Sequence, residues 1–282
     1  MDRRDLNVLS LPRVSFTKHD LSHCEVLERA FTGCTAVAHC AGINREIGEQ
    51  TYARVHVTGT QNVVQAASRA GVSKIVLLSF LRARPSCGSA YHESKWAAEE
   101  IVRGCGLDFT IFKAGMIYGR GDHMLDHLSH AFVTFPILAT VGLREKRIRP
   151  LAVEDLVHAM TAALVGARLS QETVAITGAE ELLLSEAARR VAGVLGKKVA
   201  IFPLPVWFHL ILARVCEWTM KIPLVARAQV RILAEGVVES WGASDLLPAD
   251  LQPRRMFSPE QIRSGLPDPG PFGLRDLRCC AG

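Results

Sequence analysis

Short apolar runs alternate with segments of helical periodicity along most of the chain. Five runs have the length and composition of β-strands: RVSFTKHD, AVAHCAG, KIVLLSF, FTIFKAG and VAITGA. Between and after them, apolar positions recur at helical spacing in residues 51–70, 91–104, 154–165 and 185–195. This alternation predicts an α/β fold in which a parallel sheet is covered by helices on both faces.

The pattern changes after the last of these helices. KKVAIFPLP predicts one more strand, and a helical segment and a proline-rich tail follow it. We therefore expect two parts, with the parallel sheet in residues 1–178 and a smaller, mostly helical region in residues 179–282 that holds a substrate or a partner.

Composition narrows the class of protein. With 282 residues, 49% of them apolar and 22% charged, the chain can form a large core. The net charge of +5 comes from 33 bases interspersed with 28 acids, which favours a solvated surface over a nucleic-acid-binding stripe. The apolar stretch VWFHLILARVCEWTM is interrupted by three polar or charged residues and is too short to span a membrane. We expect most of its apolar residues to belong to the core.

Two further features favour the cytoplasm. The N-terminus, MDRRDLNVLS, lacks the apolar core of a signal peptide. The eight cysteines include no C-x-x-C motif, which is typical of reduced thiols rather than of a disulfide framework.

The segment SAYHESKWAAEE carries the most specific chemistry. Tyr91 and Lys95 lie one helical turn apart on the same face, where an ammonium group lowers a phenol pKa from about 10 and the phenol serves as a general acid or base. Ser79 ends the preceding apolar strand and could hydrogen-bond the same substrate oxygen. The alternative is that Tyr91 is an aromatic residue at a helix start and Lys95 a surface base.

Five segments in this order resemble a known superfamily: VAHCAGINRE, VHVTGTQNVVQAASRAGVSKIVLLS, SAYHESKWAAEEIV, LDFTIFKAGMIYGRGD and IRPLAVEDLVHAM. They are similar to the extended or atypical short-chain dehydrogenases/reductases, which include NAD-dependent epimerases and dehydratases. The branch they resemble most contains the NAD(P)H-binding accessory subunit of respiratory complex I. The resemblance covers residues 1 to about 200 and implies a Rossmann-like, doubly wound parallel sheet.

The resemblance also implies a set of site residues. In such folds the ligand lies beyond the carboxyl ends of the strands. The implied catalytic residues are Ser79, Tyr91 and Lys95, with Lys95 also on the nicotinamide ribose. The implied cofactor-binding residues are Cys40, Ala41 and Gly42 near the adenosine side and Ala114, Gly115 and Met116 at the nicotinamide end. Gly42 is equally consistent with a turn that simply needs glycine.

Two positions depart from the superfamily pattern. His56 stands where relatives often have Asn, which weakens the expectation that this helix orders the catalytic lysine through a water. Lys113-Ala114 replaces the usual Arg-Pro pair, so the backbone constraint from proline is absent.

A histidine cluster raises the question of a metal. His123, His127 and His130 share a helical face next to Asp126. No further ligand pattern accompanies them, and the resemblance makes this segment the roof of the substrate pocket. We therefore expect no metal site.

The glycine-rich phosphate loop of the superfamily is not found in the first forty residues. Its backbone amides normally hold the pyrophosphate. We therefore expect an N-terminally truncated Rossmann sheet, in which RVSFTK lacks its usual neighbours. Either the chain begins upstream of Met1, or this is a shortened form with a compromised cofactor site.

The expected cofactor is NADP or NAD, bound weakly or lost. Arg3 and Arg4 lie where relatives that prefer NADP often carry bases for the 2′-phosphate, although two solvated arginines are equally consistent.

Three functions follow from these observations. The first is an NAD(P)-dependent oxidoreductase, epimerase or dehydratase acting on an unknown small molecule. The second is a non-catalytic dinucleotide-binding or accessory protein that meets a protein partner through residues 205–236. The third is a truncated form that has lost cofactor binding. No nucleic-acid partner and no transmembrane segment are expected.

Overall fold

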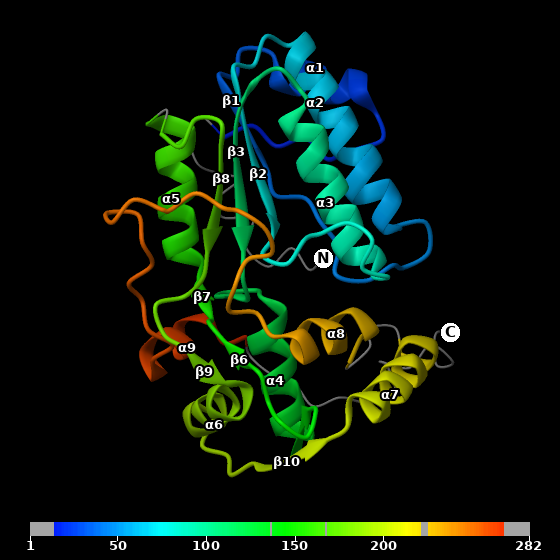
Figure 1. Ribbon diagram of the computed structural model, residues 1–282, viewed down its shortest axis with the longest axis vertical. Helices are drawn as coiled ribbons and strands as arrows, with labels where there is room; N and C mark the ends of the chain where they lie inside the picture. The colour runs from blue at the N-terminus through cyan, green and yellow to red at the C-terminus, as the bar shows by residue number, and fades with distance from the viewer. Residues whose placement is uncertain (1–13, 136, 167, 221–224, 268–282) are drawn as a thin grey trace.

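The computed structural model describes residues 14–135, 137–166, 168–220 and 225–267. Figure 1 shows an upper part built around a parallel sheet and a lower, mostly helical part. The arrowheads of the sheet point toward the lower part, so the carboxyl ends of the strands face it.

The sheet has four parallel strands in the order β1-β2-β3-β8. Their bounds are Ala36–His39 for β1, Lys74–Phe80 for β2, Asp108–Ala114 for β3 and Glu172–Ile176 for β8. The central strands β2 and β3 are buried over nearly their whole length, as expected for parallel strands covered on both faces.

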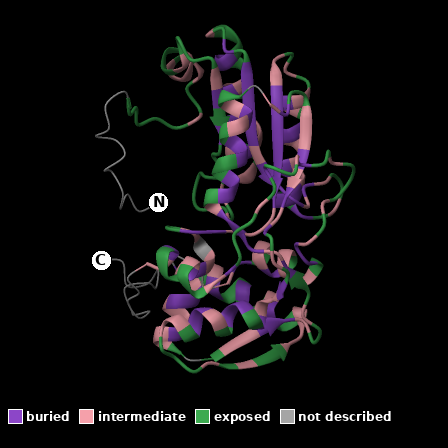
Figure 2. Ribbon diagram, turned by 90° about the vertical axis from the view of Figure 1, so that its left-hand side faces the viewer, coloured by how far each residue is buried: buried purple, intermediate pink, exposed green. Residues whose placement is uncertain are grey.

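Helices cover the two faces of the sheet. On one face lie α1 (Cys24–Phe31), α2 (Gly59–Arg69) and α3 (Ala90–Arg103), and on the other lies α5 (Val153–Val165) (Figure 1). Successive side chains of a strand point to opposite faces. Accordingly, Ile75 and Leu77 join the core beneath α2 and α3, while Val76 joins the core beneath α5. Figure 2 shows buried positions, in purple, along the strands and on parts of the helices.

One predicted strand is wrong. Within RVSFTKHD, residues 14–20 form neither strand nor helix, and the side chains of Val14 and Phe16 are 42% and 59% exposed. A strand is stabilised by hydrogen bonds to a neighbour. In the part of the chain that the structure describes, the sheet ends at β1, so this segment has no strand to pair with.

The other predicted elements are confirmed, most of them within one or two residues. The four apolar runs after RVSFTKHD form β1, β2, β3 and β8, and KKVAIFPLP forms β10 (Ala200–Leu204). The helix predicted over 51–70 begins as a π-helical turn, Ala53–Thr58, before continuing as α2. The helical segment after β10 is α7 (Val206–Thr219). None of the helices in the described ranges is long and apolar enough to cross a membrane.

The lower part combines segments from both sides of residue 178, where the sequence placed a domain boundary. Its core joins Leu125 and Phe132 of α4 (His123–Thr134) to Ala188 and Val191 of α6 (Leu184–Val194). Two strand pairs belong to it: β5 (Ile137–Val141) with β10, and β6 (Arg147–Ile148) with β9 (Leu182–Leu183). Its other helices are α7, α8 (Arg227–Glu235) and α9 (Pro259–Gly265). Two short strands, β4 (Ile117–Tyr118) and β7 (Leu151–Ala152), pair where the chain passes between the parts.

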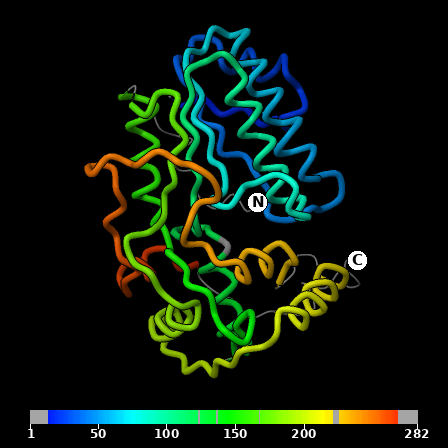
Figure 3. The backbone as a smooth tube through the Cα atoms, viewed as in Figure 1, coloured from blue at the N-terminus to red at the C-terminus, as the bar shows by residue number. Residues whose placement is uncertain are grey.

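The segment after α8 returns to the sheet before it ends in the lower part. Figure 3 shows this segment running along the side of β8 and α5. The Asp245 amide donates to the Thr173 carbonyl at 2.7 Å, and Leu247 and Leu251 pack into the core beneath α5. This return ties the lower part to the β8 edge of the sheet and to α5.

Candidate active site

The predicted site residues gather at the carboxyl ends of the strands. Cys40, Ala41 and Gly42 follow β1 directly and are exposed. Ala114 ends β3, and Gly115 and Met116 follow it, while Tyr91 and Lys95 lie in the first turns of α3. This is the edge at which open α/β sheets bind their ligands.

Lys95 and Gly42 approach one another closely. The Lys95 ammonium donates to the Leu78 carbonyl at 3.3 Å, and burial lowers the pKa of Lys95 to about 8 although Glu99 opposes the shift. A Cβ added at Gly42 would lie 3.0 Å from the Lys95 Nζ. Gly42 does not have a positive φ, so the turn itself does not demand glycine, and the absence of a Cβ lets the Lys95 ammonium lie close to the backbone.

Tyr91 lies inside an aromatic enclosure. Its ring is 5.3–5.8 Å, centroid to centroid, from four other rings: Tyr52, His56, Phe80 and His92. Burial raises the pKa of Tyr91, and Tyr52 raises it further. The expectation that Lys95 lowers this pKa is therefore wrong, because the cost of ionising a phenol away from water exceeds any effect of the ammonium. The phenol is protonated at neutral pH.

The Tyr91 hydroxyl has no hydrogen bond to any residue that the structure describes. It is thus a proton donor without a partner at the edge of the sheet.

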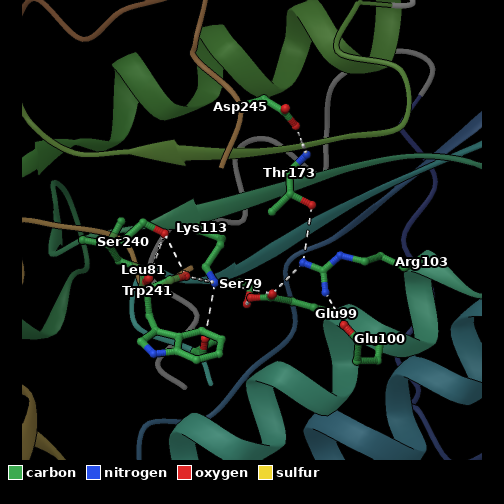
Figure 4. A network of polar contacts seen from close by, with 11 residues as sticks. Ser79, Leu81, Glu99, Glu100, Arg103, Lys113, Thr173, Ser240, Trp241 and Asp245 are labelled. Carbon is green, nitrogen blue, oxygen red and sulfur yellow. Dashed lines mark hydrogen bonds and ion pairs between the residues drawn. The ribbon is translucent and has the colours of Figure 1, made fainter. Parts of the chain in front are cut away.

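Ser79 points elsewhere. Its hydroxyl donates to a Glu99 carboxylate oxygen at 2.5 Å, and both side chains are buried. Figure 4 shows Ser79 as one end of a polar network that runs through Glu99 to Arg103 and Lys113. The structure therefore brings Tyr91 and Lys95 to the same strand-end edge and directs the Ser79 hydroxyl to Glu99.

Lys113 is the centre of this network. Its ammonium is 3.6 Å from the Glu99 carboxylate and donates to the carbonyls of Ala83 and Trp241 at 3.3 and 3.1 Å. Arg103 lies 2.9 Å from the same carboxylate. The network joins β3 and α3 to the segment around Trp241, which returns from the lower part. Lys113 therefore links the carboxyl end of β3 to both of them.

His56 joins the loop after β1 to α3. Its Nε2 accepts from the Ile43 amide at 3.0 Å, so the ring proton is on Nδ1, which donates to the Ser94 hydroxyl at 2.8 Å. Ser94 in turn donates to the Tyr91 carbonyl. Burial, with Lys95 next in effect, lowers the pKa of His56 to about 3 and keeps the ring neutral.

A second neutral histidine supports the first. Burial lowers the pKa of His39 to about 4, and its Nε2 lies 3.0 Å from the Thr60 hydroxyl. Thr60 donates to the His56 carbonyl at 2.5 Å, so His39 must be the donor to Thr60. His56 sits in the π-helical turn, a distortion that is frequent at functional sites.

Sequence patterns did not reveal all of these residues. Glu99 was missed, although it lies one turn beyond Lys95 on the same face of α3 and that spacing was a usable signal. The aromatic neighbours Tyr52, Phe80 and His92 come from separate segments, and no local pattern relates them to Tyr91.

The described residues fit only one end of a dinucleotide. At the nicotinamide end, the Lys95 ammonium beside Gly42 is a charged donor of the kind that ribose hydroxyls accept from. For the pyrophosphate, residues 14–135 contain no glycine-rich loop at a helix N-terminus. Arg3 and Arg4, considered for NADP preference, lie outside the described residues.

The absence of a metal site at the histidine cluster stays a prediction, because the structure describes only part of the cluster. The His130 Nδ1 donates to the Asp126 carbonyl at 2.8 Å within α4. The His123 side chain lies outside the described set. No group of three metal-binding side chains occurs among those that the structure describes.

The comparisons place this geometry in a class. Residues 3–127 match the family model described as NAD(P)H-binding. The fold is shared with the UDP-glucuronic acid 4-epimerase from Bacillus cereus in complex with NAD, at a TM-score of 0.60 and 18% identity, over 71% of this chain and 72% of that one. The fold is therefore the Rossmann-like, doubly wound α/β fold that the motifs predicted, and its first part, residues 3–127, matches an NAD(P)H-binding domain. The predicted cofactor class is the one that the family model describes.

Two curated relatives are informative. The mitochondrial NADH dehydrogenase [ubiquinone] 1 alpha subcomplex subunit 9 of Mus musculus is 23% identical over 243 residues, which is 86% of this chain and 62% of the subunit. The ceramide reductase of Caulobacter vibrioides is 27% identical over 186 residues, which is 66% of this chain and 58% of the reductase. The chain spans 24% of the length of an uncharacterized Mycobacterium tuberculosis relative and 62% and 58% of the lengths of these two.

Proposed function

We propose that this protein is an NAD(P)H-dependent oxidoreductase of the cytoplasm that reduces a carbonyl group of a small molecule. The observation that carries the proposal is the pair formed by the Lys95 ammonium against Gly42 and the protonated Tyr91 phenol one helical turn away. Both groups lie at the strand-end edge where proteins of this fold bind dinucleotides.

Lys95 and the glycine-containing loop would hold the nicotinamide end. With a pKa near 8, Lys95 is charged at neutral pH and can donate to both ribose hydroxyls. Cys40 and Ala41 are small and exposed, which allows the backbone after β1 to approach the adenosine side. Gly115 and Met116 continue from β3 beside the nicotinamide position. The cofactor, when bound, supplies a hydride.

Tyr91 would supply the proton. Because burial raises its pKa, the phenol is in the acid form, which suits protonation of the oxygen that forms when a carbonyl accepts a hydride. The proton transfer leaves a phenolate at Tyr91, which a proton from solvent must neutralise before the next turnover, and the reverse reaction would begin from that same phenolate. The Ser79 hydroxyl would have to leave Glu99 to assist, so its role as a substrate contact is the least supported of the three.

Cofactor binding is tested by titration of the full chain with NADPH and NADH, followed by nicotinamide fluorescence. Lys95→Met is expected to weaken binding at least tenfold because the ribose loses its charged donor. Lys198→Met, at an exposed lysine of the lower part, is the matched control and should leave the affinity unchanged. Equal affinities for wild type and Lys95→Met would remove Lys95 from the site.

Catalysis is tested by the oxidation of NADPH with a panel of carbonyl compounds that includes ceramides, which the name of the Caulobacter relative suggests. Tyr91→Phe is expected to lower kcat by about 100-fold or more while the dissociation constant of NADPH stays the same. Unchanged turnover in Tyr91→Phe would exclude the phenol as the proton donor.

A second candidate is a non-catalytic dinucleotide-binding or accessory protein. Two observations favour it: Ser79 donates to Glu99, and the Tyr91 hydroxyl has no partner among the described residues. The relationship to a complex I subunit supports it as well, and a protein partner at residues 205–236 would belong to this candidate. Tight NADPH binding by a wild-type protein that reduces no compound of the panel would favour it over the first.

A further inference from the structure

Helix α7 carries a continuous apolar surface that faces outward. Its six exposed apolar side chains are Trp207, Phe208, Ile211, Leu212, Val215 and Trp218. At 100° per residue they fall within an arc of about 140° around the helix axis. No charged residue of the helix lies inside this arc, which we call the α7 apolar face.

The opposite side of α7 fixes this orientation. His209, Ala213 and Cys216 are buried, and Ala213 packs with Val141 of β5 and Val230 of α8. Figure 1 shows α7 at the outer edge of the lower part, with α8 beside it. The sequence predicted most of these apolar residues to be core. That prediction is wrong for the α7 apolar face, where Trp207 and Trp218 are 63% and 79% exposed.

Positive charge borders the α7 apolar face. Arg214 is exposed at one side of the arc, and Arg144 is exposed in the loop that meets the start of the helix. A Cβ at Gly142 would lie 3.7 Å from the Val206 side chain, which places this loop against α7. Neither arginine has an ion pair with a residue that the structure describes. The one acid of the helix, Glu217, lies outside the arc and is paired with Arg227 at 2.7 Å.

We propose that the α7 apolar face docks the protein on an anionic lipid surface, with the helix lying in the plane of the interface. A helix of 14 residues is about 21 Å long, too short to span a bilayer but long enough to lie on one. The tryptophans near its two ends have the amphipathic rings that favour the headgroup region. Lipid phosphates would supply the countercharge that Arg144 and Arg214 lack.

A second copy of the chain fits the same surface less well. The α7 apolar face presents no free acid to meet Arg214 of another molecule, because Glu217 is already paired. The proposal depends only on α7 and its neighbours, not on the cofactor site.

The test is co-sedimentation of the full chain with vesicles. Wild type is expected to bind vesicles of phosphatidylcholine that contain about 30% phosphatidylserine, because anionic lipid attracts basic surfaces. It is expected to bind vesicles of pure phosphatidylcholine less. Trp207→Ser combined with Trp218→Ser should weaken binding at least tenfold, and Arg214→Gln should reduce the preference for phosphatidylserine. Leu246→Ser is the control, because Leu246 is 93% exposed but lies beside β8, away from α7.

Circular dichroism verifies that each variant is folded. Absence of wild-type binding to both vesicle types would overturn the proposal. Dimers that the double tryptophan variant abolishes, with no vesicle binding, would assign the surface to a second copy. Loss of NADPH binding or turnover would bear on the proposed function and leave the vesicle result as it stands.

Discussion

At the scale of single residues, the environment of a side chain decides its chemistry. Tyr91 and His56 both titrate away from their ordinary ranges because they are enclosed, and in each case the neutral form is kept. His56 occupies a position where relatives often carry Asn, yet it makes two directed hydrogen bonds, to Ile43 and Ser94. It is a positioning residue, because its two hydrogen bonds hold the loop that contains Gly42 next to the helix that carries Lys95.

This predicts a dependence of stability on pH. The folded-state pKa values of His56 and His39, about 3 and 4, lie below the ordinary value of 6.5. Below pH 6.5 the unfolded chain therefore binds protons that the folded chain does not, and the free energy of unfolding falls as the pH drops toward 4. His56→Asn should reduce this slope by up to about 1.4 kcal/mol per pH unit. Urea denaturation at pH 7, 5.5 and 4.5 measures it.

The exposed His158 provides the control for this comparison, because His158→Asn should leave the slope as in wild type. Asp122, whose pKa burial raises to about 6, contributes in the opposite direction but equally in all three proteins. A slope in His56→Asn equal to that of wild type would mean that His56 is not buried in its neutral form.

At the scale of elements, α3 organises the site. Its first turns carry Tyr91, Ser94 and Lys95 on the strand-end side, and its next turn carries Glu99 into the buried network with Lys113. Two opposite charges from neighbouring elements thus meet in the interior. Backbone carbonyls accept from the Lys113 ammonium, and Ser79 and Arg103 donate to the Glu99 carboxylate. Such a pair is weak evidence for added stability, but breaking it leaves a buried charge without compensation.

Lys113→Met is therefore expected to lower the free energy of unfolding by about 3 kcal/mol. The carboxylate of Glu99 would be left with the Ser79 hydroxyl and with Arg103 as its one nearby cation, and the Trp241 carbonyl would lose its ammonium donor. Adding Glu99→Gln should recover part of the loss, because the uncompensated charge is removed. Urea denaturation measures the three proteins, with the exposed Lys197→Met as a control within about 0.5 kcal/mol of wild type. A loss of similar size in Lys197→Met and Lys113→Met would contradict a special role for the network.

At the scale of the whole molecule, the strand ends face a second part that is assembled from both sides of residue 178. The return of the chain through Asp245 and Leu251 fixes that part against the sheet. At the strand ends, the described residues offer the pyrophosphate of a dinucleotide no cradle of amides. For this reason the affinity of the 282-residue chain for NADPH is expected to be in the micromolar range or weaker, and a submicromolar value would contradict this account.

The α7 apolar face belongs to the same scale. It lies on the lower part and faces away from the core, so surface docking and cofactor binding use separate regions of the molecule. Both activities can therefore be tested independently in the same variants.

The local pattern of the sequence determined the parallel sheet, most of the helices and the placement of Tyr91 and Lys95 on one helical face. These follow from the spacing of apolar positions and from helix geometry, which act over a few residues. The strand expected at residues 14–20 failed because strand formation depends on a neighbouring strand, and the local pattern carries no information about whether one is present.

Only the tertiary structure decided the chemistry of the site. The partner of Ser79, the raised pKa of Tyr91 and the close approach of Lys95 to Gly42 each depend on side chains from distant segments. Likewise, the composition of α7 is compatible with a core helix. Its apolar face is exposed because neighbouring elements pack only against the opposite side of the helix. Burial and pairing are properties of the assembled fold, so the residue pattern names the candidates and the surrounding elements determine their protonation, partners and accessibility.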